Sequence, residues 1–217
     1  MKSLAREFLS DQDREKIIQT VREVELTTAG EIVPMVVSRS SSYPMADVIG
    51  GVVFALPVSW VLTHIIGGLL WIGHQDMWLF SGVFTACFIV FHQTCKQVPW
   101  LKRLFIFPGE MEEEVEEAAA TRFFREGLYQ TRNGTGILIF ISVFERRVWV
   151  LGGRGINEKV SKDNWGSIVH IITSGIKQKN QAEAVCLAVR EAGRLIQENF
   201  PIAPGDQDEL KNLIIEE

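Results

Sequence analysis

The sequence predicts an α/β fold, in which helices flank a small sheet and a two-helix transmembrane hairpin is inserted into the domain. Three observations predict this fold. Two long stretches without Asp, Glu, Lys or Arg lie close together in the first half of the 217 residues. Around them, amphipathic helical patterns alternate with short runs of β-branched residues. Finally, 47% of the residues are apolar, which excludes a disordered chain, because disordered chains bury too little apolar surface.

The first part of the domain, residues 1–45, is expected to contain one helix and one strand. Ser10 is a good N-cap, and Asp11 and Asp13 follow it in the first turn, where acids complement the helix dipole. Apolar residues then recur at helical spacing up to residue 24. The β-branched run at 32–37 predicts a strand, and a polar linker follows it.

Residues 46–107 are expected to form the hairpin and an interfacial segment. No Asp, Glu, Lys or Arg occurs at 48–75, and none occurs at 77–95. About 20 helical residues cross the ~30 Å hydrocarbon layer, so spans at about 48–71 and 77–95 are long enough. Trp71 and Trp78 stand at the turn, where an aromatic belt belongs. The alternative is a pair of buried helices in a soluble protein.

Positive charge orients this predicted multi-pass hairpin. The turn carries no Lys or Arg, whereas Arg39, Lys96, Lys102 and Arg103 flank the outer ends. Because Lys and Arg are enriched on the cytoplasmic side, both termini and the soluble domain are predicted to be cytoplasmic.

The second part of the domain, residues 108–217, is expected to contain three helices and two strands. Six glutamates lie between Glu110 and Glu117, where they fit the first turns of a helix, with a metal site as the alternative. Runs at 137–142 and 148–151 predict strands joined by a short connection. Helices are expected to start near Asp163 and at about Gln181.

Several motifs on both sides of the hairpin resemble the TPM domain family of thylakoid and related membrane proteins. They are TAGEIV at 28–33, FREGL at 124–128, GILIFIS at 136–142, ERRV at 145–148, Gly155-Ile156, Trp165, Phe200-Pro201 and DQDEL at 206–210. The chain most resembles the bacterial two-span members. The resemblance implies a sandwich with helices on both faces of a small sheet, and a place in the bacterial inner (plasma) membrane. It also implies either a phosphatase that binds calcium or an assembly accessory.

The sequence lacks the usual nucleophile patterns of phosphatases. Six positions after Cys87, Cys95 and Cys186 stand residues other than arginine, so a phosphate loop of the cysteine type is excluded. The stretch Gly152–Gly155 follows a strand but lacks the further residues of a nucleotide loop, so a bent turn is expected there. Catalysis or metal binding by carboxylates is therefore the chemistry that the sequence still allows.

Five acidic residues are the candidate site residues. Glu31 at the start of the first strand and Asp163 at a helix start are the candidate catalytic residues. Asp206, Asp208 and Glu209 are candidate calcium ligands, because calcium prefers oxygen ligands, although the Gly and the spaced Glu of an EF-hand are missing. Solvated or structural carboxylates are the alternative in each case.

Two functions from different classes follow from these observations. The first is a non-enzymatic accessory or interaction module in membrane protein assembly or maintenance, with the lipid bilayer and another membrane protein as partners. The second is a metal-assisted acid phosphatase, a phosphomonoesterase for which calcium is a candidate metal. A net charge of −5 argues against nucleic acid as a partner.

Overall fold

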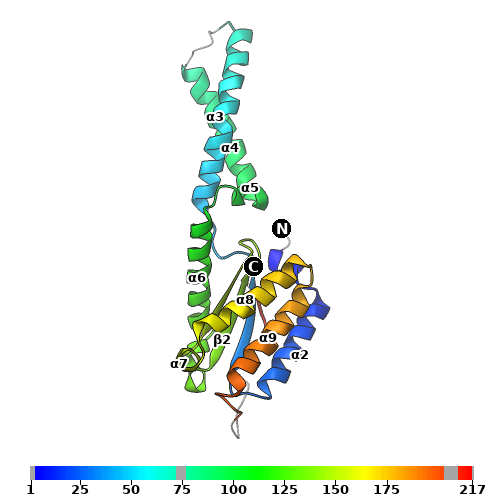
Figure 1. The fold of residues 1–217 in the computed structure, drawn as a ribbon. Helices are drawn as coiled ribbons and strands as arrows, with labels where there is room; N and C mark the ends of the chain where they lie inside the picture. The colour runs from blue at the N-terminus through cyan, green and yellow to red at the C-terminus, as the bar shows by residue number, and fades with distance from the viewer. Residues whose placement is uncertain (1–2, 72–76, 203–209, 217) are drawn as a thin grey trace. The chain divides into compact units, whose positions relative to one another are not determined.

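The computed structural model describes residues 3–71, 77–202 and 210–216. The chain divides into two compact units (Figure 1). We call the first the sheet domain, which combines Met1–Ser41 with Glu112–Glu217, and the second the hairpin unit, Ser42–Met111. The hairpin unit is therefore an insertion in the sequence of the sheet domain.

A four-stranded sheet in the order β3-β2-β1-β4 forms the centre of the sheet domain. Strands β1 (Glu31–Val37) and β2 (Gly136–Ser142) run parallel, and all their residues are buried. Strand β3 (Arg147–Gly152) pairs antiparallel with β2, and β4 (Ile214–Glu216) pairs parallel with β1. A strand buried on both faces reads as a continuous apolar run, which is the pattern of β1 and β2.

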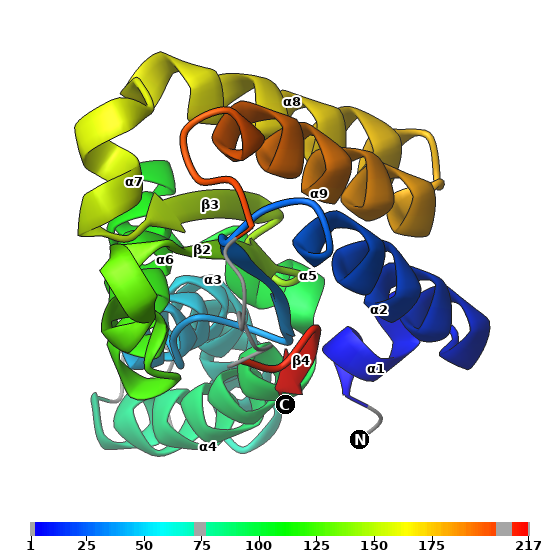
Figure 2. The ribbon, with the colours of Figure 1, turned by 90° about the horizontal axis from the view of Figure 1, so that it is seen from below.

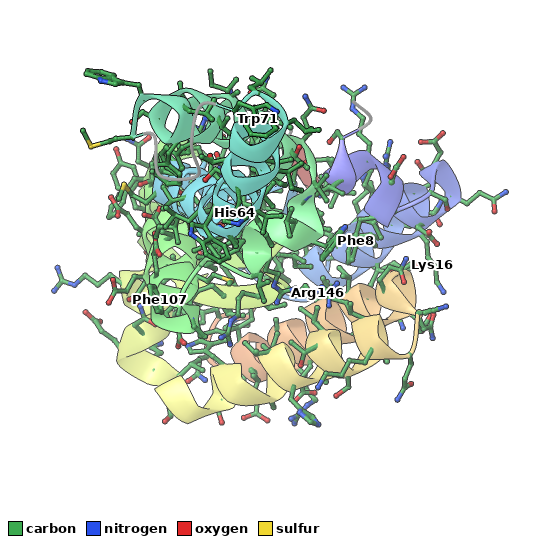
Figure 3. The ribbon with its side chains drawn as sticks, turned by 90° about the horizontal axis from the view of Figure 1, so that it is seen from above. Phe8, Lys16, His64, Trp71, Phe107 and Arg146 are labelled. Atoms are coloured by element: carbon green, nitrogen blue, oxygen red, sulfur yellow. The ribbon has the colours of Figure 1, made fainter. Side chains whose placement is uncertain are left out.

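Three long helices cover one face of the sheet (Figure 2). They are α2 (Asp11–Glu25), α8 (Lys162–Lys177) and α9 (Gln181–Gln197). Helix α2 begins with the predicted N-cap. Ser10 Oγ accepts from the Asp13 amide, and the Ser10 amide donates to the Asp13 carboxylate at 3.0 Å, which completes a capping box. Lys16 of α2 also donates to Glu183 of α9 (Figure 3).

Helix α6 (Pro108–Arg125) covers the other face. Its Val115, Ala119 and Phe123 pack with side chains of all four strands. The acidic stretch forms its first turns, as predicted, and most of the glutamates are exposed. Gly127 follows the helix with a φ of 80°, the left-handed conformation in which glycine commonly ends helices. The predicted sandwich is confirmed.

Short elements complete the sheet domain. They are α1 (Leu4–Phe8), the 3-10 turns Leu128–Gln130 and Arg132–Gly134, and α7 (Arg154–Lys159). The sequence analysis predicted none of these, and it predicted no strand at the position of β4 (Ile214–Glu216).

The hairpin unit contains α3 (Pro44–Leu69), α4 (Met77–Gln97) and α5 (Pro99–Arg103). Helices α3 and α4 are each long and apolar enough to cross a membrane. They pack closely, because a Cβ at Gly50 would lie 2.7 Å from the Cys95 sulfur. A buried ion pair joins α3 to α5, with Lys102 Nζ 2.8 Å from an Asp47 oxygen.

Candidate functional site

Glu31 lies where the two parallel central strands begin. It is the first residue of β1, stands opposite Gly136 of β2, and is 9% exposed. Its amide donates to the Thr135 carbonyl at 3.3 Å, so the backbone of this carboxylate is fixed by the neighbouring strand. The same end of the sheet holds two glycine-containing turns.

We call the contact between these turns, 133–136 and 152–155, the glycine junction. A Cβ at Gly153 would lie 2.3 Å from the Gly134 carbonyl oxygen, and one at Gly155 would lie 2.2 Å from that of Asn133. The two glycines are thus needed for close backbone approach, since a Cβ in either place would clash. The Gly153 amide donates to the Gly136 carbonyl at 2.7 Å. This amide is engaged by the sheet, which fits the predicted bent turn.

The structure describes little of the other predicted site residues, Asp163, Asp206, Asp208 and Glu209. Asp163 lies in the first turn of α8, but its side chain is not described. Asp206, Asp208 and Glu209 lie outside the described residues. Within the described part of the chain, no three His, Cys, Asp or Glu side chains gather as a metal site. The described residues therefore give calcium no defined site.

Glu145 is a buried carboxylate that the sequence analysis did not single out. It lies in the turn between β2 and β3 and is 0% exposed. One of its oxygens accepts from the Ser40 amide at 2.9 Å, and the other accepts from the Ser142 hydroxyl. Because β2 rises by about 3.3 Å per residue, roughly 20 Å separates this carboxylate from Glu31. The two buried acids therefore belong to opposite ends of the sheet.

A second polar cluster ties the last strand to helix α6. Arg122 Nε donates to the Glu216 carboxylate at 2.7 Å, and Arg125 donates to its other oxygen. The Arg122 guanidinium also lies 5.4 Å from the centre of the Phe140 ring. Burial lowers the pKa of Arg122, and the charge of Arg125 lowers it further. Both arginines stand in the last turn of α6, where cations complement the helix dipole.

The outer side of β3 forms the floor of an open groove of about 570 Å³. Helix α6 contributes Glu112, Val115 and Glu116 to one wall. Helix α8 contributes its residues to the other wall, and α7 closes one end. The remaining lining residues are Arg147, Val148, Trp149, Val150, Leu151, Gly152, Asn157, Trp165, Gly166 and Val169. The groove is thus lined by valines and indoles, with two carboxylates and one guanidinium.

Comparison with known proteins agrees with this architecture. The model of the TPM domain family matches residues 103–195. The NMR structure of the BA42 protein from the psychrophilic bacterium Bizionia argentinensis is similar to this chain, with a TM-score of 0.58. That match covers 98% of this chain and 97% of BA42 at 20% sequence identity, so it shows the fold. No curated protein matches the chain. Together with the sandwich described above, the family match supports a TPM domain in this chain.

Proposed function

We propose that this protein is a membrane-anchored interaction module that binds another membrane protein and acts in its assembly or maintenance. One observation carries the proposal: two long apolar helices are inserted into the TPM domain itself. Strand β1 ends at Val37 and α3 starts at Pro44, so about 20 Å of extended chain is the longest tether on that side. On the other side, α6 begins in the hairpin unit and packs on the sheet.

The exposed surface of the hairpin unit supports a lipid environment. Trp60 and Ile65 of α3 are 70% and 52% exposed, and Ile89 and Val90 of α4 are each 61% exposed. Soluble monomers rarely expose apolar patches of this size. A bilayer would cover these side chains. The hairpin unit would then anchor the TPM domain to the bilayer.

We place this anchor in the bacterial inner membrane with the TPM domain in the cytoplasm. Arg39 and Lys96 flank the outer ends of the two helices, and positive flanks favour the cytoplasmic side. Lys102 contributes less to this orientation than its place in the sequence suggests. It is 7% exposed and paired with the Asp47 carboxylate, which largely neutralises its charge.

The positions of the two buried carboxylates, Glu31 and Glu145, favour a binding role over catalysis. General acid and base catalysis needs a positioned group within hydrogen-bond reach of the substrate. Glu31 is buried beside the glycine junction, and Glu145 is engaged by Ser40 and Ser142 at the other end of the sheet. The groove on β3 is an open surface of the described domain, and it is lined by indoles, valines, two carboxylates and one guanidinium.

Site-directed photo-cross-linking in native membranes tests the proposal. A photoreactive residue is placed at Tyr129 or at Leu187, both exposed on the TPM domain, and at Ile89 as a control that faces lipid. We expect one discrete adduct with a membrane protein from at least one domain position, and lipid adducts alone from Ile89. The absence of any protein adduct from the domain positions would overturn the proposal.

A metal-assisted acid phosphatase is the second candidate. Glu31 lies beside the glycine junction, from which α7 leads directly to the first turn of α8 with Asp163. Phosphate release from a generic phosphomonoester is measured on the detergent-purified protein, with calcium or chelator, from acidic to neutral pH. We expect the same release from the natural protein, Glu31→Gln and Asp163→Asn. Release that is lost in either variant would establish the enzyme.

A further inference from the structure

The groove is built on the free edge of the sheet. Among the residues that the structure describes, β3 is the last strand on its side, and β2 is its partner on the other side. The bond from the Gly153 amide to the Gly136 carbonyl fixes which residues of the antiparallel ladder exchange hydrogen bonds. Because that exchange alternates along a strand, the amides and carbonyls of Val148 and Val150 point away from β2 and into the groove.

One contact agrees with this alternation and marks the end of the open edge. Gly152 follows the same phase as Val148 and Val150, so its carbonyl also points away from β2. Asn157 of α7 donates its side-chain amide to that carbonyl at 2.6 Å. The outward carbonyl of Gly152 is therefore already hydrogen-bonded within the chain. The open part of the edge is the stretch of β3 that precedes Gly152.

The two walls of the groove differ in chemistry. On the α6 side, Glu112 and Glu116 are exposed and stand one helical turn apart. On the α8 side, the wall consists of Trp165, Gly166 and Val169. A Cβ at Gly166 would meet nothing within 4 Å, so this wall is open to an incoming side chain. One wall is acidic and the other is apolar.

We propose that the groove binds an extended polypeptide segment of the partner, which adds a strand to β3 and alternates basic with apolar residues. This inference names the partner chemistry for the interaction role proposed above and rests on it. The backbone of the segment would bond to the outward groups of Val148 and Val150. Its basic side chains face α6, and its apolar side chains face α8, because side chains of a strand alternate between the two faces.

The spacing of the two glutamates matches such a segment. Residues four apart on a helix are about 6 Å apart along its axis. Side chains two apart on a strand are about 6.6 Å apart. Two cations at alternate positions would therefore meet Glu112 and Glu116 in turn. Trp149 lies on the same side of the sheet, where its ring adds a cation–π surface.

Charge also disfavours a second copy of this chain as the occupant. A second copy would bring its own Glu112 and Glu116 next to these two carboxylates. Arg147 at the end of the groove supplies one cation against them, so the lining is net negative. A basic segment of another protein is complementary to this lining, whereas a second copy repeats it.

Binding of the fluorescent peptide Lys-Val-Lys-Val-Lys-Val to the full chain in detergent tests the proposal by anisotropy. We expect binding that weakens with salt, and none for Glu-Val-Glu-Val-Glu-Val. The double variant Glu112→Gln with Glu116→Gln is expected to weaken binding about threefold to tenfold, since two exposed ion pairs are lost. The matched control is Glu113→Gln with Glu117→Gln, which removes the same charge from the same helix outside the groove and should leave binding unchanged.

Two further probes test the geometry rather than the charge. Gly166→Trp fills the open wall and is expected to abolish binding, while its exposed helical position keeps the fold intact. Peptides N-methylated on all Lys or on all Val amides carry the same charge, but only one of the two sets faces β3. We expect one methylated peptide to lose binding and the other to keep it.

Equal binding by both methylated peptides, or equal loss in the two double glutamine variants, would overturn the proposal and indicate attraction to general negative charge. These outcomes are separate from the cross-linking test of the proposed function. A membrane protein captured at Tyr129 or Leu187 while the peptide fails would leave the interaction role standing and remove the groove as its site.

Discussion

The two ends of strand β3 are closely packed, whereas the side of the strand that faces away from β2 is open. At its start, Glu145 is fully buried and accepts hydrogen bonds from Ser40 and Ser142. At its end, the glycine junction brings backbone against backbone with no room for a Cβ. Along its side, the strand faces an open groove in which a Cβ at Gly166 would meet nothing within 4 Å. Natural sheets usually protect their edges, and this open edge is where we propose that the partner segment binds.

The other edge of the sheet sharpens this comparison. Strand β4 has three residues, and Glu216 at its end is held by Arg122 and Arg125 of α6. A short edge strand offers few backbone groups to a foreign chain, and charged side chains at an edge discourage pairing. The two edges therefore differ in how many backbone groups they can offer: β4 has three residues, and β3 has six.

Adding a methyl group at the glycine junction should have the largest effect. In Gly155→Ala the new Cβ would lie 2.2 Å from the Asn133 carbonyl oxygen, and a backbone atom cannot rotate away. We expect a loss of about 3 kcal/mol in the free energy of unfolding. Thermal unfolding followed by circular dichroism measures it, and an unchanged melting temperature would contradict the close packing.

Removing the buried carboxylate at the start of β3 should come next. Glu145→Ala leaves the Ser40 amide and the Ser142 hydroxyl without their acceptor. The expected loss is about 1–3 kcal/mol in the free energy of unfolding. Glu158→Ala, a change of the same type at an exposed position, serves as the control and should stay close to the natural protein.

The open side of β3 should respond in the opposite direction. Gly166→Ala adds a methyl group to the middle of α8 where there is room for it. Because alanine favours helix more than glycine does, we expect a gain of about 0.5–1 kcal/mol in the free energy of unfolding. The same melting experiment measures it. A loss of stability would show that the wall of the groove is already filled.

The smallest effect concerns the surface pair between α2 and α9. The hydrogen bond that Lys16 donates to the Glu183 carboxylate lowers the pKa of Glu183 and raises the pKa of Lys16. A carboxyl with a lowered pKa stabilises the fold above its unfolded pKa of 4.5, and this contribution is lost as the pH falls through the folded pKa. A lysine with a raised pKa stabilises the fold below 10.5 and loses its contribution as the pH rises through its folded pKa.

Lys16→Met should therefore flatten the pH dependence of stability slightly at both extremes. The Lys16 side chain is 52% exposed and the Glu183 side chain is 34% exposed, so solvent screens the pair and the effect is expected to be near the resolution of the melting experiment. Arg194→Met, which removes the cation beside Glu191 within α9, provides a comparison at a pair that joins no second helix. A larger change in Lys16→Met than in Glu145→Ala would contradict the ranking.

Local patterns in the sequence predicted the central elements of the sheet domain. Buried parallel strands and amphipathic helices leave continuous or periodic apolar patterns, and the N-cap at Ser10 is a local signal as well. Strand β4 lacks such a signal. Its three residues pair with Met35, Val36 and Val37, which are far away in the sequence. A local segment of sequence around residue 214 does not include strand β1, so local patterns cannot predict this pairing.

The candidate site was harder to predict for a related reason. Glu145 stands in a short polar connection, which reads as an exposed turn, and it is buried only because residues 38–40 pass beside it. Helix α7 was missed because glycine at 155 disfavours a helix, although close approach to Asn133 requires it there. The groove depends on which strand is at the edge, and strand order is a property of the whole fold.

The register of β1 has a consequence for the order in which the protein is made. Glu31 pairs with Gly136, and Met35 pairs with Ile214, so both neighbours of this strand are synthesised after the hairpin unit. At about 5–20 residues per second, β1 waits several seconds for β2 to leave the ribosome. During that time a seven-residue apolar strand has no native partner, and such segments aggregate readily. Membrane insertion of α3 and α4 during translation would hold this nascent strand away from other chains until the sheet can close.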